Sequence, residues 1–63
     1  MIIAKHIYMP DRNEWLAVIA EGTDPDAPYS TIEVLDVETR KSEAEILEWI
    51  KQALVDRPWE HIS

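Results

Sequence analysis

Three short segments of the chain carry the apolar, β-branched and aromatic residues that favour strands. The first strand is predicted at residues 2–9 (IIAKHIYM), which end at Pro10. The second is predicted at residues 15–20 (WLAVIA), an unbroken apolar run typical of a strand buried on both faces. The third is predicted at residues 29–37 (YSTIEVLDV), where acidic side chains interrupt the pattern as on an edge strand. The polar segment 11–14 is short, so we expect a hairpin between the first two strands.

The segment between the second and third strands is predicted to be a loop. It holds the only glycine of the chain, Gly22, and two of its four prolines, Pro25 and Pro28. Its two aspartates, Asp24 and Asp26, are spaced as at the start of a calcium-binding loop. An EF-hand then needs glycine at its sixth position and glutamate at its twelfth, where this chain has tyrosine and leucine. We therefore predict a solvated turn and keep both aspartates as candidate contacts of a partner.

The hydrophobic pattern takes the period of a helix after Ser42. Ser42 and Glu45 match the S-x-x-E capping box, which marks a helix N-terminus. Apolar residues then recur on one predicted inner arc, which contains Ile46, Leu47, Ile50, Ala53 and Leu54. Pro58 is expected to end the helix, because it disfavours helical geometry in the residue before it. The tail, residues 59–63, is too short to predict an element, although Trp59 is able to fold back onto the core.

These elements predict one small α+β domain that spans residues 1–63. A three-stranded antiparallel sheet, a β-β-β meander with the apolar second strand in its centre, is followed by one C-terminal amphipathic helix packed on one face. The chain has 63 residues and no cysteine, so neither disulfides nor thiolate-bound metals support its core. Because such a core supplies only about 3–5 kcal/mol, we expect marginal stability or support from a partner.

One helix covers one face of a sheet, and here both faces are apolar. In the second strand two apolar sets alternate, Trp15, Ala17 and Ile19 against Leu16, Val18 and Ala20. The sequence does not decide which set meets the helix, and we take Trp15, Ala17 and Ile19 as the candidate self-association face. Since large apolar patches mark interfaces, a homodimer is the simplest expectation. The alternative is that the tail, with Trp59 and Ile62, wraps over the second face.

The charge of the chain excludes several classes of partner. Thirteen acidic and six basic residues give a net charge of −7, and the basic residues are scattered. Direct binding to nucleic acid or to anionic membranes is therefore not expected. No apolar run approaches the ~20 residues of a membrane span, and the N-terminus does not resemble a signal peptide. Together with the absence of cysteine, this predicts a cytoplasmic protein.

No set of residues predicts catalysis, a metal ion or a cofactor. His6 and His61 are the only histidines, and the serines lack a glycine-framed nucleophile turn. A zinc site or a small hydrolase would need His6 and His61 to converge with a carboxylate, and the spacing does not indicate this. A single glycine cannot build a Gly-rich phosphate cradle. We therefore expect a non-enzymatic protein in which both histidines have structural or surface roles.

Acidic residues collect on the predicted outer face of the helix. This acidic face consists of Glu45, Glu48, Gln52 and Asp56, with Trp49 at its border. It either keeps the domain soluble or steers it onto a basic partner, where a bordering tryptophan adds contact. Our main hypothesis is an inhibitor or regulator that docks on a larger basic, nucleic-acid-handling protein by imitating phosphate.

The general profile is similar to that of small acidic phage-encoded inhibitors and anti-CRISPR proteins, although no motif of such a family is matched. The alternative hypothesis is a structural, assembly or antitoxin-like subunit that self-associates through its apolar sheet face.

Overall fold

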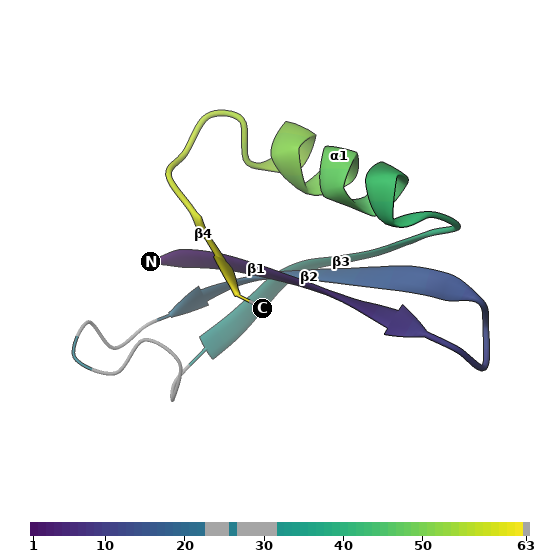
Figure 1. The fold of residues 1–63 in the computed structure, drawn as a ribbon. Coiled ribbons are helices and arrows are strands. Elements are labelled where there is room, and N and C mark those ends of the chain that lie inside the picture. Colours follow the sequence, from purple (N-terminus) through teal and green to yellow (C-terminus); the bar gives the residue numbers. More distant parts are fainter. Residues whose placement is uncertain (23–25, 27–31, 63) are drawn as a thin grey trace.

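The computed structural model describes residues 1–22, 26 and 32–62, and within them it shows a small α+β fold. A mixed sheet of four strands carries one helix on one of its faces (Figure 1). The elements are β1 (Ile2–Met9), β2 (Glu14–Gly22), β3 (Ile32–Arg40), α1 (Glu43–Ala53) and β4 (Glu60–Ile62). The predicted fold class is confirmed, whereas the predicted number of strands was too low.

The sheet has the strand order β3-β2-β1-β4. The predicted meander is present, because β2 pairs antiparallel with both β1 and β3. The tail, predicted to be too short for an element, instead adds β4 parallel to β1, with Ile3–Lys5 opposite Glu60–Ile62. A three-residue strand has no readable hydrophobic period, but it forms here because an edge of β1 is already in place to pair with it. The predicted start of the third strand, at 29–31, lies outside the described residues.

The turn between β1 and β2 is tight and is closed by local hydrogen bonds. The backbone N–H of Arg12 donates to the carbonyl of Met9 over 3.2 Å. Asn13 has a φ of 54°, a left-handed conformation that asparagine tolerates better than most residues. The Tyr8 hydroxyl donates to Oδ1 of Asn13 over 2.6 Å and so holds this side chain in place. The predicted hairpin is therefore confirmed.

The helix begins where its capping box predicts. Ser42 is the N-cap, and its Oγ accepts from the backbone N–H of Glu45 over 3.2 Å. The same hydroxyl donates to Oε1 of Glu45 over 2.9 Å, so the glutamate side chain meets the serine hydroxyl. The helix ends at Ala53, with Leu54 as its C-cap, and thus several residues before Pro58.

The core lies between α1 and one face of the central strands. It consists of Ile2, Ala4, Ala17, Ile19, Ile46, Ile50 and Leu54, with Trp15, Leu47, Trp49 and Trp59 packed against it. Ile46 and Ile50 are fully buried, and burying a side chain of this size stabilises a fold by roughly 1.5–3 kcal/mol. Ala53, predicted on the inner arc, is exposed instead. The predicted return of Trp59 onto the core is confirmed.

The register between the strands corrects the candidate self-association face. Ala17 and Ile19 lie beneath α1 in the core, with Trp15 packed against them. Ala4 and Ala17 are almost completely buried beneath α1, at 1% and 0% exposure. The set of β2 residues that faces away from the helix is Leu16, Val18 and Ala20. Within the part of the chain that the structure describes, no helix is long and apolar enough to cross a membrane.

Candidate functional site

The face of the sheet opposite α1 carries a continuous apolar surface, which we call the open face. It consists of Ile3, Lys5 and Ile7 of β1, Leu16, Val18 and Ala20 of β2, Ile32, Val34 and Val37 of β3, and Ile62 of β4. Ile3 and Ala20 are themselves buried, at 6% and 2% exposure, so the accessible part of this face lies mainly on Ile7 and β3. The side chains from β3 are the most accessible, with Ile32 at 51%, Val34 at 56% and Val37 at 51% exposure. Side chains of this type are usually buried, so their collection on one face makes it a candidate binding surface.

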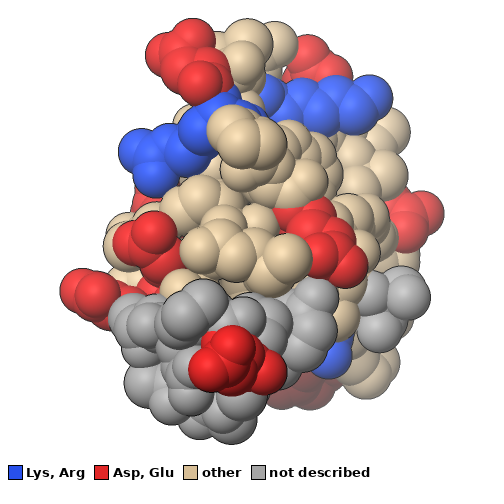
Figure 2. Space-filling view, turned by 90° about the vertical axis from the view of Figure 1, so that its left-hand side faces the viewer, with Lys and Arg blue, Asp and Glu red and all other residues tan. Residues whose placement is uncertain are grey.

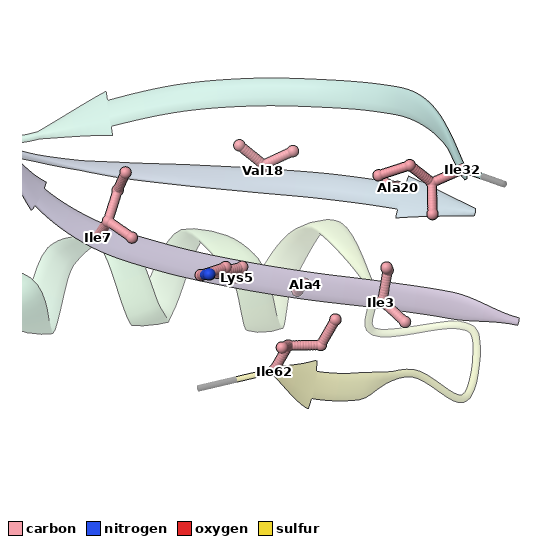
Figure 3. A pocket seen from close by; sticks show the side chains of 8 residues that line it. All are labelled: Ile3, Ala4, Lys5, Ile7, Val18, Ala20, Ile32 and Ile62. Carbon is pink, nitrogen blue, oxygen red and sulfur yellow. The ribbon is translucent and has the colours of Figure 1, made fainter. Parts of the chain in front are cut away.

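A shallow apolar hollow of about 290 Å³ lies within the open face. Figure 3 shows its lining side chains on the viewer's side of the sheet, with the helix behind. Ile62 closes one side of the hollow from β4, and Ile32 lies at the start of β3 on the other side. Lys5 is the charged member of this lining, and its long aliphatic stem is compatible with apolar surroundings. The hollow therefore offers an apolar floor with one positive charge.

The acidic face predicted on the helix is assembled only in part. Glu45 and Glu48 are exposed on one side of a second hollow, of about 480 Å³, with the half-buried Trp49 and with Gln52. Gln52 Nε2 donates to Oε1 of Glu48 over 3.0 Å. Asp56 is exposed, but it follows the end of α1 and does not line this hollow.

Basic groups interrupt the acidic surface. The second hollow is also lined by Arg40, whose guanidinium pairs with Glu38 over 2.8 Å. The hydrogen bond from Arg40, and then that from the backbone N–H of Thr39, lowers the pKa of the Glu38 carboxyl. On the side of the molecule seen in Figure 2, basic side chains lie beside the upper acidic ones, and the other acidic side chains stand apart from one another. Of the predicted acidic face, Glu45 and Glu48 are thus the carboxylates that share one hollow.

Of the two candidate contacts in the long loop, the structure describes only Asp26. Asp26 is exposed. Asp24 lies outside the described residues, so its place relative to the open face and the helix stays untested.

The two histidines converge, which the sequence analysis did not expect. Nδ1 of His6 lies 2.8 Å from Nε2 of His61, and Nε2 of His6 lies 2.9 Å from Oε2 of Glu43. The imidazole rings stack at a centroid distance of 4.8 Å, and the indole of Trp15 lies 5.6 Å from His6. This histidine cluster, Glu43–His6–His61, joins α1, β1 and β4. It was missed because only the pairing of β4 with β1 brings position 61 next to position 6.

The histidine cluster has the connectivity of a hydrogen-bonded chain. Glu43 and His61 occupy opposite nitrogens of the His6 ring, so the three groups do not point at a common centre. Among the described residues, no group of three or more histidine, aspartate or glutamate side chains is arranged to hold a metal ion. The arrangement is a chain of two short polar contacts that connects three elements.

Comparison with known proteins assigns no role to these surfaces. No protein-family model matches the chain, and no curated protein or solved structure is detectably similar to it.

Proposed function

We propose that this chain is a non-enzymatic interaction protein that self-associates through its open face. The observation that carries the proposal is the exposure of Ile32, Val34 and Val37 on the same face as Ile7. The core is complete without these side chains, because α1 packs on the other side of the sheet. Covering the open face would remove apolar surface from water and so favours association.

A second copy of the chain is the occupant that fits the open face best. Each copy carries a net charge of −7, so two copies repel wherever their acidic residues meet. The hollow in the open face has Lys5 as its charged lining residue and no carboxylate among its lining residues, so two copies that meet there do not bring acidic side chains of the hollow together. Two sheets packed face to face about 10 Å apart, related by a two-fold axis, would bury the exposed β3 side chains of both copies.

Sedimentation equilibrium of the wild type and of V37K tests this proposal. The wild type is expected to approach twice its 7.3 kDa mass as concentration rises, and V37K to stay monomeric because it buries an unpaired charge. V55K is the matched control, because Val55 is 73% exposed and lies outside the sheet. It should dimerise like the wild type. A wild type that is monomeric at millimolar concentration, or an equal loss in both variants, would refute self-association through this face.

Salt provides an independent check on the same samples. Added salt screens the repulsion between two copies of equal charge, so self-association through the open face should strengthen between 50 and 500 mM NaCl. Dimerisation that weakens steeply with salt would point instead to an interface built from charge pairs.

A regulator that docks its acidic face on a basic, nucleic-acid-handling protein is the second candidate function. The observation that favours it is Trp49, which lies half-buried between the exposed carboxylates Glu45 and Glu48 in one hollow. Tryptophan at the centre of a charged contact is typical of interface hot spots. In this function the protein would occupy a channel that otherwise receives phosphate groups.

A labelled decalysine peptide is a suitable probe for this second function. Wild-type protein should bind the peptide with an affinity that falls as salt rises, and E45K/E48K should lose most of the binding. The matched control is D11K/E33K, which makes the same change of charge at two exposed sites away from α1. Equal weakening by both double variants would show a general effect of net charge and would exclude a specific acidic face.

A further inference from the structure

We propose that the histidine cluster is a proton-sensitive latch that holds β4 on β1 and releases it when both histidines are protonated. The inference deepens the proposed function, since β4 supplies Ile62 to the open face and the latch would then regulate that face. It rests on the two hydrogen-bond distances in the cluster and on the small size of β4.

The neutral cluster satisfies each of its hydrogen bonds. With Glu43 ionised, the Nε2–H of His6 donates to the carboxylate. The Nε2–H of His61 then donates to the lone pair on Nδ1 of His6. A first proton is accepted at Nδ1 of His61, and one hydrogen still lies between the two rings. The chain Glu43–His6–His61 therefore stays closed with either no added proton or one.

A second proton breaks the contact between the rings. The only remaining place for it is the lone pair between Nδ1 of His6 and Nε2 of His61, which lie 2.8 Å apart. Two N–H groups then face each other, and two imidazolium charges stand in rings whose centroids are 4.8 Å apart. Glu43 compensates one of these charges, because its carboxylate contacts His6 only. Histidine as a class is the side chain that responds to pH near neutrality, so acidification is the change that tests the latch.

Other charged groups near the cluster do not offset the second positive charge. The positions that face His6 from β2 are occupied by Ala17 and Trp15, which are uncharged. Lys5 and Glu60 are the charged neighbours of His6 and His61 along the chain. Their side chains point to the other face of the sheet, because side chains alternate along a strand. Glu38 lies in register two strands away, about 10 Å distant, and is paired with Arg40. The nearby charged groups other than Glu43 are thus Lys5, Glu60, Glu38 and Arg40.

β4 is the element that such a change releases. It has three residues and pairs only with Ile3–Lys5, whereas α1 is anchored by the fully buried Ile46 and Ile50. Loss of the bond to His61 leaves Ile62 and the half-buried Trp59 as the apolar contacts of the tail. Release moves Ile62 away from the hollow and removes one wall of the open face. Self-association is therefore expected to be weaker at pH 5.5 than at pH 7.5.

The latch is tested first in V37K, so that the outcome does not depend on dimerisation. Heteronuclear NOE values of the His61 and Ile62 amides should show an ordered β4 at pH 7.5 and a disordered one at pH 5.5. The amide of Ile50 should stay ordered at both values, which excludes global unfolding. pH 5.5 lies above the range in which carboxylates as a class take up protons, so a change between the two values does not come from them.

The control variant carries H61Q in the same V37K background. A glutamine amide is able to donate to or accept from Nδ1 of His6, whatever the protonation of that ring. β4 should then stay ordered at both pH values. An ordered β4 at pH 5.5 in the chain with His61, or equal disorder in both chains, would overturn the latch. If β4 opens as expected but the wild type does not dimerise at pH 7.5, the latch stands and the proposed function fails.

Discussion

The two faces of the sheet carry the same kind of residues, but α1 covers only one of them. In β2 the set Trp15, Ala17, Ile19 and the set Leu16, Val18, Ala20 are equally apolar, yet only the first is covered by α1. The covered face packs against Ile46 and Ile50 of α1. The open face has branched side chains on the accessible strand β3 instead. The covered face therefore holds the core of the fold, whereas the open face carries the exposed apolar side chains Ile7, Ile32, Val34 and Val37.

The largest expected difference in stability between variants of the two faces comes from truncating a buried isoleucine on the covered face. Ile50→Ala removes a fully buried side chain between α1 and the sheet and should lower the free energy of unfolding by roughly 2–5 kcal/mol. Because so small a core supplies only about 3–5 kcal/mol, this variant should be largely unfolded at 25 °C by circular dichroism. The matched change on the open face is Ile7→Ala.

Ile7 is nearly half exposed, so its truncation should cost no more than about 1 kcal/mol in urea denaturation of the monomer. Equal losses for Ile50→Ala and Ile7→Ala would show that both faces are buried in the species that unfolds. That result would mean that the dimer, and not the monomer, is the folding unit.

A smaller effect on the free energy of unfolding is expected at Ser42, the N-cap of the helix that covers the sheet. Ser42→Ala removes the hydroxyl that accepts from the backbone N–H of Glu45 and should cost about 1 kcal/mol of unfolding free energy. Ser42→Asp should restore most of this loss, because aspartate also caps helices. Thermal melts followed at the helical band check both values. Failure of the aspartate to rescue would indicate that the hydroxyl matters through its own donation to Glu45 and not through the cap.

The sequence predicted those features that depend on neighbours in the chain. The capping box at Ser42 and the hairpin between β1 and β2 were correct, because each is determined by residues within a few positions. The core positions Ile46 and Ile50 followed from helical spacing alone. These signals are local, and a single sequence carries them in full.

Features that depend on distant pairing were not predicted. The choice of covered face needs the register of β1 on β2 and the approach of α1, and an apolar pattern on both sides contains no information about either. The strand β4 and the meeting of His6 with His61 arise from one parallel pairing between the two ends of the chain. The acidic face was predicted by helical spacing, but Arg40, which enters it from β3, was not.

The smallest expected effect concerns the ion pair between Glu38 and Arg40 on the edge strand β3 and its contribution to the stability of the fold. Arg40 lowers the pKa of Glu38 by its hydrogen bond, so Arg40→Gln should raise that pKa towards the ordinary glutamate value in an NMR titration. A carboxyl whose pKa is lowered by folding stabilises the fold above the pKa of the unfolded chain, and this contribution is lost as the pH falls through the folded value. Since Glu38 is at the surface, the change in stability should be barely measurable even at pH 7.

The Glu38 resonance in Lys41→Gln serves as the control, because Lys41 pairs with Glu14 and not with Glu38. An unchanged titration of Glu38 in Arg40→Gln would show that the bond from the Thr39 N–H, and not the guanidinium, sets its pKa.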